Sequence, residues 1–543
     1  MAAEYDYIVI GAGSAGCVVA NRLSAPGGGS VLLLEAGGSS RGVLYRMPLA
    51  ATKLWFNPRS SWCYWSEPEP GLGGRRLPVP RGKALGGSSA INGTIYNRGS
   101  PEDFDQWRDA GLIGWDYRSL LPYFRRIESH WRGSDERHGA GGEVPVTPLR
   151  CLSPLAPAFL EAARQMGIPL TEDFLGLRPE GIGLPEMNID RRGRRVSAAD
   201  AFLWPIRSRK TLAIAQRTQA LRLLIERGRA VGIEYLAGRE RCTVRASKEI
   251  ILSAGAIASP QLLLLSGIGA PEELRAHGIA AVHELSGVGR NFNDQPGGSF
   301  EFRCKQPLSF ARLLRIDRFV FGLAQWALGL GGPAAGPPMV VMGAWRTDER
   351  SRSPDLRMMV AAATPQSKVW YPGTAAAGEH RLGMNFAVAH PTSRGSITLA
   401  SADPLAAPRI RYNLLTNSRD MECLKKFYRL LRELVRQPAL TGVVGELTRP
   451  LPEPGTDGDL ETYLRSIAVT TAHPMGTCRM GHDEEAVVDT QCRVRGLAAL
   501  RVIDASVFPN QISGNPHAAI MMLGDRVSDM ILGRPGLAAE AQP

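Results

Sequence analysis

The chain opens with a hydrophobic run that has the character of a buried strand. Residues 5–10, YDYIVI, lead into GAGSAG, and apolar positions then recur at helical spacing as far as Leu23. A second apolar run at 31–34 ends in Glu35. A strand, a glycine turn, a helix and a second strand form a β-α-β unit, so this pattern predicts a Rossmann-like α/β fold at the amino terminus.

Further along, the pattern alternates between helical and strand-like segments. Asp116 precedes a helical pattern at 117–129 and is expected to cap it. Strand-like runs follow at 212–224, 298–302 and 383–388. Helices and strands are therefore mixed along the whole chain, and the two later runs are candidates for a second sheet.

Length, composition and charge set limits on the class of protein. The 543 residues exceed what one hydrophobic core usually supports, and 44% hydrophobic with 21% charged residues is typical of globular proteins. The net charge is +12, but only eight of the 64 basic residues are lysines, and the arginines are dispersed. This dispersal argues against nucleic-acid binding, and only 191–195 stands out as a compact basic run. The net charge leaves anionic substrates or membrane surfaces open.

The cysteines and the first residues indicate a cytoplasmic location. Eight cysteines are scattered without a CxxC pair, which suits a reducing compartment better than a disulfide framework. The first strand starts almost at residue 1, so no secretory signal is visible. No run of about 18 apolar residues exists, and no transmembrane segment or metal site is expected.

The first glycine turn predicts a dinucleotide site. Gly11 permits a tight turn, Gly13 lets a pyrophosphate approach the backbone, and Gly16 allows the helix to pack closely on the strand. The amino terminus of the helix offers free N–H groups and a positive dipole to phosphate. Glu35 can accept hydrogen bonds from both ribose hydroxyls, and its charge disfavours NADP. This unit alone does not separate FAD from NAD.

Two further stretches carry candidate chemistry. Residues 81–94, RGKALGGSSAINGT, combine a permissive backbone with short polar side chains, which suits contact with a flat ligand but also describes an ordinary loop. His473 lies in HPMGTCRMG, where proline and glycine favour a non-helical turn. A lone histidine is more often structural than catalytic, so this stretch by itself leaves both roles open.

Taken in order, these motifs resemble the glucose–methanol–choline (GMC) family of FAD-dependent oxidoreductases. GAGSAG, LLLEAG, GKALGGSSAINGTIYNRG, GAIASPQ, HPMGTCRMG and SGNP follow one another along nearly the whole chain. The resemblance implies an α/β (α+β overall) architecture, in which a Rossmann-like FAD-binding domain is interleaved with a substrate-binding domain built on an antiparallel sheet. The FAD-binding domain is expected at 1–150, 192–296 and 467–535, and the substrate-binding domain at 151–191 and 297–466.

The resemblance also implies where FAD binds. The adenosine half is expected on the first glycine turn and beside Ala220, and the rest of the cofactor beside the second glycine stretch. Ile91 stands where some members carry a histidine bonded to FAD, so the cofactor is expected to be non-covalent. The implied cofactor-binding residues are Gly11, Gly13, Ser14, Gly16, Glu35, Ala36, Gly86, Gly87, Ser88, Asn92, Gly93, Thr94, Ala220, Asp504, Ala505, Asn515, Pro516 and His517.

The same resemblance implies that His473 is the catalytic base and Asn515 its partner. Oxidation of an alcohol removes a hydroxyl proton and passes a hydride to flavin N5, and histidine titrates close enough to neutrality to take that proton. His517 is an alternative second group, and His390 is a further candidate for the pocket. The remaining histidines are expected at the surface or at helix ends: His130, His138, His277, His283, His380 and His482.

The predicted activity is oxidation of an alcohol to an aldehyde or ketone. A hydrophobic aliphatic or aromatic alcohol is the expected substrate, and oxygen, a quinone or another carrier would accept the electrons. A non-redox lyase of the hydroxynitrile-lyase type and a light-driven fatty acid decarboxylase, which occur in relatives, are alternatives. A binding protein with a vestigial cofactor is a further alternative, against which the intact pair of His473 and Asn515 speaks.

Residues 310–345 are an unusual part of the sequence. They begin as an amphipathic helix and continue into a loop rich in glycine and proline. Three interpretations are open: a helix packed on its own domain, an apolar lid over the site, or weak membrane contact. An apolar lid would favour hydrophobic alcohols over sugars.

Overall fold

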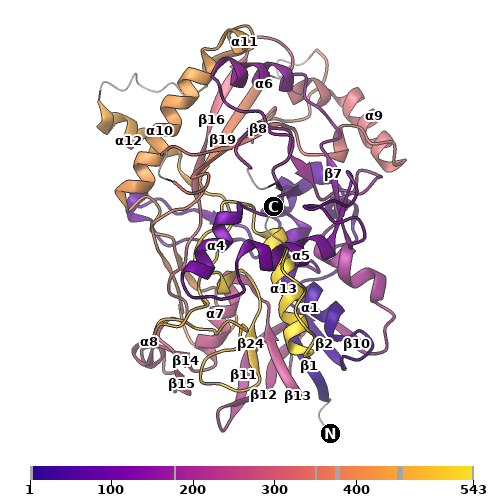
Figure 1. The fold of residues 1–543 in the computed structure, drawn as a ribbon, viewed down its shortest axis with the longest axis vertical. Helices are drawn as coiled ribbons and strands as arrows, with labels where there is room; N and C mark the ends of the chain where they lie inside the picture. The colour runs from indigo at the N-terminus through magenta and orange to yellow at the C-terminus, as the bar shows by residue number, and fades with distance from the viewer. Residues whose placement is uncertain (1–3, 177–178, 349–350, 374–378, 449–455, 541–543) are drawn as a thin grey trace.

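Two large β-sheets lie toward opposite ends of the molecule, as Figure 1 shows. The computed structural model describes residues 4–176, 179–348, 351–373, 379–448 and 456–540. Helices pack against both sheets, and the predicted mixed α/β architecture is confirmed.

The first sheet contains the predicted amino-terminal unit. β1 (Glu4–Ile10) and β2 (Val31–Glu35) pair in parallel, and α1 (Ser14–Leu23) connects them. α13 (His517–Ile531) lies alongside α1 in Figure 1. The other strands are β10 (Leu212–Gln216), β11 (Thr218–Glu226), β12 (Arg229–Ala237), β13 (Glu240–Leu252) and β24 (Leu500–Val502). The strand order is β10–β2–β1–β13–β12–β11, with β24 beside β13.

Two predicted segments end differently from expectation. The run 212–224 is two strands, because Arg217 adopts a left-handed conformation with φ of 57° and turns the chain between β10 and β11. The helix predicted at 117–129 is α5 (Tyr117–Ile127), and its last two residues belong to a strand instead. The expected cap is confirmed, since the Asp116 carboxylate accepts a hydrogen bond from Ser119 N at 3.1 Å.

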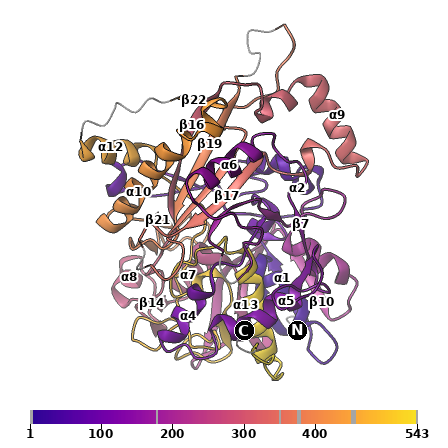
Figure 2. The ribbon, with the colours of Figure 1, turned by 45° about the horizontal axis from the view of Figure 1, so that its top comes forward.

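The second sheet is antiparallel, as predicted. Its strands are β8 (Gly181–Gly183), β16 (Pro296–Cys304), β17 (Met339–Trp345), β18 (Leu356–Ala361), β19 (Arg381–Val388), β22 (Val444–Leu447) and β23 (Val469–Thr470). The order is β22–β16–β19–β18–β17–β8, with β23 beside β16. Figure 2 shows helices on the outer side of β16 and β19.

Side chains alternate between the two faces of this second sheet. On one face, Phe386 packs against Phe427 of α10 (Ser418–Val435), with ring centroids 5.0 Å apart. Arg357 and Asn385 belong to the opposite face, where residues are less completely buried. The apolar face therefore anchors the sheet, and the other face carries Arg357, which reaches Asn515 of the candidate site.

The domain boundaries remain a prediction, but the strands show how the chain is shared between the two sheets. All strands of the first sheet come from the three predicted FAD-binding pieces, and most of the second sheet comes from the predicted substrate-binding pieces. β23 is an exception, because it pairs with β16 although it lies within 467–535.

None of the helices in the described ranges has the length and apolar character needed to span a bilayer.

The other helices and strands lie outside the two large sheets or pack against them. The remaining helices are α2 (Val43–Arg46), α3 (Ala51–Trp55), α4 (Pro101–Asp109), α6 (Ala156–Gln165), α7 (Gly255–Leu265), α8 (Pro271–Ala276), α9 (Ile316–Ala327), α11 (Pro438–Thr441) and α12 (Asp457–Ile467). The remaining strands are β3 (Tyr64–Trp65), β4 (Pro78–Val79), β5 (Ile95–Tyr96), β6 (Glu128–His130), β7 (Val144–Pro148), β9 (Glu186–Met187), β14 (Ile268–Gly269), β15 (His283–Glu284), β20 (Ser396–Thr398) and β21 (Arg409–Arg411).

Candidate active site

Three predicted cofactor segments meet at the amino terminus of α1. Gly86 N donates to Ala12 O at 2.8 Å, which joins the second glycine stretch to the first. Ser14 Oγ lies 2.8 Å from His517 Nδ1, so the start of α13 reaches the same turn. A Cβ added to Gly16 would lie 1.9 Å from Gly11 O, and the turn therefore has no room for a side chain there.

The amino terminus of α1 fits an anionic group. No side chain caps this helix, and its first N–H groups cannot find acceptors within the helix. Unsatisfied N–H groups together with the helix dipole favour phosphate at such a position. This arrangement is consistent with the predicted pyrophosphate position.

Glu35 is buried beneath the glycine turn. Its Oε2 accepts a hydrogen bond from Ala12 N at 2.9 Å, and its Oε1 accepts one from Gly37 N at 2.7 Å. Burial raises the pKa of Glu35 to about 7. Thr218, two residues before Ala220, donates to Glu35 O at 3.5 Å and brings β11 to the same place. Each carboxylate oxygen keeps a further lone pair for a ribose hydroxyl.

The second glycine stretch contains buried polar groups with open hydrogen-bonding capacity. Asn92 Oδ1 accepts hydrogen bonds from Thr94 N at 3.0 Å and from Arg195 Nη1 at 2.5 Å. Thr94 Oγ1 and Arg195 Nη2 are enclosed without a partner among the described residues. Burial lowers the pKa of Arg195 to about 9. Buried polar atoms rarely stay unsatisfied, so these two fit contact with a bound polar ligand such as FAD.

Asp504 joins the first sheet to the segment that carries His473. Its Oδ2 accepts hydrogen bonds from Gly255 N at 2.8 Å and Ser259 Oγ at 2.6 Å. The next residue, Ala505, accepts a hydrogen bond from Gly476 N at 3.2 Å. Asp504 therefore ties α7 to β24, and the HPMGTC segment is held against this junction.

His473 lies in a hydrogen-bonded position at the meeting point of the two sheets. Its Nδ1 is 2.9 Å from Gln295 Oε1, and its backbone N donates to Asp294 Oδ1 at 2.9 Å. Its Nε2 is 3.0 Å from Asn515 Nδ2. Both ring nitrogens of His473 thus face polar groups, and the residue as a whole is half-buried.

The orientation of the Asn515 amide fixes the tautomer of His473. Asn515 Oδ1 accepts hydrogen bonds from Asn97 Nδ2 and Arg357 Nη2, both at 2.6 Å. Because both of these groups are donors, the amide NH₂ must point toward His473 Nε2. Nε2 therefore carries a lone pair, and Nδ1 carries the proton that is donated to Gln295.

The electrostatic surroundings keep His473 neutral. Burial lowers the pKa of His473 well below its ordinary value of 6.5, and the positive charges of Arg357 and Arg81 lower it further. Burial also lowers the pKa of Arg357 to about 10, so this guanidinium stays charged at neutral pH. A neutral imidazole whose Nε2 carries a lone pair is the form that a general base requires.

The other candidate histidines take separate positions. His517 lies against Ser14, and burial, with a contribution from Arg195, lowers its pKa to about 4. His390 Nε2 lies 2.7 Å from Asp103 Oδ1, and no hydrogen bond joins it to His473 within the described ranges. The structure therefore brings Asn515, rather than His517 or His390, to His473.

His130 and His138 were expected at the surface or at helix ends, but His130 lies in strand β6 and neither residue is at the surface. Both are buried, and their rings stack with centroids 3.9 Å apart beside Glu128. These three residues are close enough to hold a metal ion, but Arg98 already forms an ion pair with Glu128. Burial opposes the charge on His138, yet hydrogen bonds to Asp173 and Glu128 raise its pKa to about 9. A metal ion at this cluster would have to displace the proton of His138.

Several site residues were not found from the sequence. Arg357 comes from a strand far away in the chain, and no local pattern marks it. Asn97 and Gln295 stand near the recognised motifs, but only the folded structure shows that they hold Asn515 and His473. Arg195 lies in the compact basic run 191–195, which was read only as charge.

Comparison with known proteins gives consistent findings. The amino-terminal model of the GMC oxidoreductases matches residues 5–297, and the carboxy-terminal model matches 391–524. An oxygen-dependent choline dehydrogenase of Vibrio vulnificus is 38% identical over 99% of this chain and 96% of its own. Its counterpart in Escherichia coli K12 is 38% identical over 98% of this chain and 96% of its own.

Solved structures give the same result. A pyridoxine 4-oxidase from Mesorbium loti is 31% identical, covers 97% of this chain and 98% of its own, and superposes with a TM-score of 0.86. A formate oxidase is 25% identical, covers 98% of both chains, and has a TM-score of 0.90. The similarity thus extends over both sheets.

Proposed function

The chain belongs to the GMC oxidoreductase family and is an FAD-dependent oxidoreductase that acts on CH–OH donors, and we propose that His473 is the base that takes the hydroxyl proton of an alcohol. The observation that carries this proposal is the contact between His473 Nε2 and Asn515 Nδ2 at 3.0 Å, beside the second glycine stretch and the start of α13. In this arrangement His473 is neutral, and the lone pair of its Nε2 is directed toward the amide of Asn515.

The residues around His473 define how a substrate hydroxyl would be held. An alcohol oxygen lying beside this 3.0 Å contact, within reach of both nitrogens, would accept the hydrogen bond of Asn515 Nδ2 in place of His473 and donate its own proton to His473 Nε2. Gln295 would keep its hydrogen bond to Nδ1 throughout and stabilise the imidazolium that forms. When bound, FAD supplies the acceptor of the hydride at N5. A base placed in this way contributes about 10²- to 10⁴-fold in rate.

We further propose an uncharged hydrophobic alcohol, aliphatic or aromatic, as the substrate. Arg357 contacts Asn515, and Met359 follows it on the same face of β18. A cationic substrate within about 6 Å of the guanidinium would meet a repulsion of about 3 kcal/mol at an effective dielectric constant of about 20. The named choline dehydrogenases act on a cation, so Arg357 is a reason to expect a different preference here.

The electron acceptor and the compartment are also proposals. Oxygen, a quinone or another carrier would reoxidise the cofactor. A cytoplasmic location is supported by the eight cysteines, all of which are free thiols. Ile91, at the position of the covalent histidine in some relatives, supports a non-covalent cofactor.

Anaerobic mixing of the yellow holoprotein with a panel of alcohols tests this function. Benzyl alcohol and a medium-chain primary alcohol should bleach the flavin absorbance, choline should do so more slowly, and admitted air or a quinone should restore the colour. Release of an aldehyde from a cyanohydrin without bleaching would identify a lyase instead. A flavin that no alcohol reduces would contradict the proposal.

A further inference from the structure

An apolar stripe on helix α9 (Ile316–Ala327) faces solvent. Val320 is 56% exposed and Phe321 is 65% exposed, and Ala324 follows one turn later on the same side. Beyond the end of the helix, Leu328 and Leu330 are 75% and 72% exposed. We call these five residues the α9 stripe.

The opposite side of α9 is also apolar. Trp326 is buried, and its Nε1 donates a hydrogen bond to Gly193 O at 2.8 Å. Gly322 packs against Pro333. Packing on its own domain, one of the three interpretations of this segment, therefore accounts for the inner side only. A surface helix normally presents polar residues to water, so the α9 stripe indicates a second, apolar partner.

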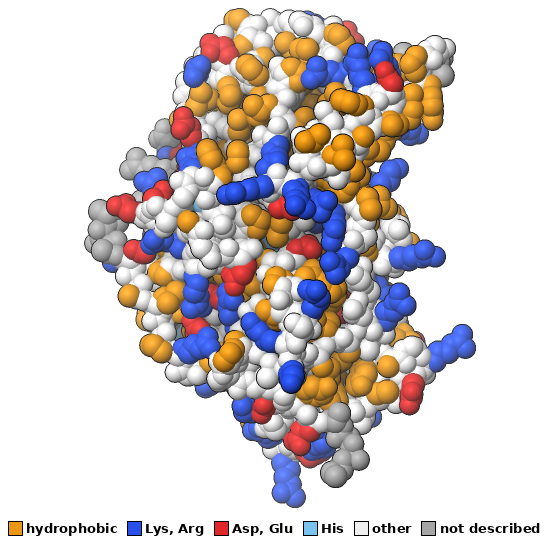
Figure 3. Space-filling model, turned by 90° about the vertical axis from the view of Figure 1, so that its right-hand side faces the viewer, with side chains coloured by type: hydrophobic (Ala, Val, Ile, Leu, Met, Phe, Trp, Pro, Cys, Tyr) orange, Lys and Arg blue, Asp and Glu red, His pale blue; other side chains and the backbone are white. Residues whose placement is uncertain are grey.

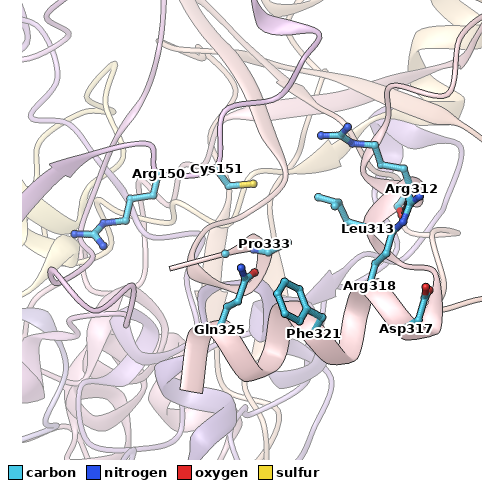
Figure 4. Close-up of a pocket in the computed structure, with 10 residues that line it drawn as sticks. Arg150, Cys151, Arg312, Leu313, Asp317, Arg318, Phe321, Gln325 and Pro333 are labelled. Atoms are coloured by element: carbon cyan, nitrogen blue, oxygen red, sulfur yellow. Dashed lines mark hydrogen bonds between the residues drawn. The ribbon is translucent and has the colours of Figure 1, made fainter. Parts of the chain in front are cut away.

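Arginines surround the α9 stripe. A cleft of about 540 Å³ next to α9 is lined by Arg150, Arg312 and Arg318, together with Phe321. Figure 4 shows Phe321 rising from α9 into this space. None of the three arginines forms an ion pair with any residue that the structure describes. The acidic residue of the cleft, Asp317, is engaged by Arg315 at 2.5 Å.

The compact basic run of the sequence lies against the same helix. The hydrogen bond from Trp326 to Gly193 joins α9 to the middle of 191–195. Arg191 and Arg192 are exposed, and neither forms an ion pair within the described part of the chain. Figure 3 shows hydrophobic side chains interspersed with Lys and Arg on the upper part of the face that turns α9 to the viewer. We call Arg150, Arg191, Arg192, Arg312 and Arg318 the arginine rim.

We propose that the α9 stripe and the arginine rim bind the surface of an anionic lipid bilayer. The stripe would enter the boundary between headgroups and acyl chains, and the rim would contact lipid phosphates, as in other amphipathic helices that lie in the membrane plane. The positive charge of the arginine rim favours an anionic lipid surface over a purely apolar protein partner. Such a partner would leave five unpaired arginines at the interface. This proposal does not depend on the identity of the substrate.

The expected loss of membrane binding follows from the number of arginines that are replaced. One arginine near an anionic membrane surface changes binding about fivefold at physiological ionic strength. Reversing Arg150 and Arg318 to glutamate should therefore weaken binding at least about 25-fold. Raising the salt concentration from about 0.1 M to about 1 M shortens the screening length from about 10 Å to about 3 Å and should weaken wild-type binding similarly.

Flotation of the holoprotein with vesicles tests the proposal. The protein should float with vesicles of equal parts phosphatidylcholine and phosphatidylglycerol, and much less with phosphatidylcholine alone. The variant Phe321→Ser/Leu328→Ser and the variant Arg150→Glu/Arg318→Glu should both lose flotation while retaining the flavin spectrum and the rate of flavin reduction by a water-soluble alcohol.

A matched control is Ile113→Ser/Leu405→Ser, which removes two apolar side chains that are 76% and 54% exposed elsewhere on the surface. This control should float like the wild type. No binding to anionic vesicles, or equal loss in the control, would overturn the proposal. So would a concentration-dependent dimer in light scattering that only the Phe321 and Leu328 variant dissociates, because the stripe would then join two copies of the chain.

Discussion

Replacing Arg357 with methionine should shift the preference of the protein from neutral toward cationic alcohols. The guanidinium donates to Asn515 Oδ1 at 2.6 Å, and a hydrogen bond from a charged group contributes about 1.5–3 kcal/mol. Its loss should reduce kcat/KM for benzyl alcohol about 10- to 100-fold. For choline, removal of about 3 kcal/mol of charge repulsion should offset this loss. The choline-to-benzyl-alcohol ratio should therefore rise about 100-fold.

The same substitution should change the pH profile. A base acts in its unprotonated form, so activity is lost as the pH falls through the pKa of His473. In the wild type this pKa is held well below 6.5 by burial first and then by Arg357, so activity should be nearly constant around neutrality. Without the positive charge of Arg357 the pKa rises, and the acid limb of kcat/KM should move to higher pH.

Steady-state kinetics of both alcohols between pH 5 and 8 would measure both effects, because histidine titration falls in about this window. Arg303→Met is a suitable control, since Arg303 is an exposed arginine of the same sheet. An unchanged ratio together with an unchanged acid limb would refute the role given to Arg357. If activity toward all substrates is lost and the acid limb of kcat/KM does not shift, the role of Arg357 is structural only.

Three further outcomes are expected. Asn97→Ala should lower kcat at least about tenfold with flavin retained, because Asn515 loses one of the donors that orient its amide, and single-turnover reduction measures this. Gly16→Ala should prevent FAD uptake or folding, since the new Cβ would lie 1.9 Å from Gly11 O, and flavin content with circular dichroism separates the two. His517 has a folded pKa of about 4 against an ordinary 6.5, so its stabilising effect is present above pH 6.5 and lost as the pH falls toward 4. Between pH 7 and 4.5, urea unfolding of the apoprotein should therefore show about 2–3 kcal/mol more loss for the wild type than for His517→Asn.

The sequence predicts those parts of the fold whose cause is local. The β-α-β unit follows from hydrophobic spacing and the glycine turn, and the cap at Asp116 follows from the residue that precedes a helical pattern. The division of 212–224 was missed because it depends on the positive φ of Arg217, which its polar neighbours Gln216 and Thr218 do not by themselves signal. A non-glycine residue in that conformation depends on contacts such as its own N–H to Gly37 O, which come from elsewhere in the chain.

The candidate site likewise contains residues that the sequence predicts and residues that only the folded structure reveals. His473 and Asn515 lie in conspicuous motifs, and the structure brings them to 3.0 Å. The groups that set their chemistry, Arg357 and Gln295, come from strands and loops whose approach depends on the second sheet. The sequence around His138 is polar and therefore predicts a surface position. In the structure His138 is buried, and its ion pairs with Glu128 and Asp173 offset the cost of burying its charge. Asp173 lies 35 positions further along the chain, so no local pattern reveals this partner.

The central claim is that the neutral imidazole of His473 takes the proton of the alcohol. Anaerobic stopped-flow reduction of the bound flavin by benzyl alcohol, compared between the wild type and His473→Ala, tests it most directly. The variant should remain yellow and bind FAD, but its reduction should slow by about 10²- to 10⁴-fold. A variant that is reduced as fast as the wild type would show that another group takes the proton.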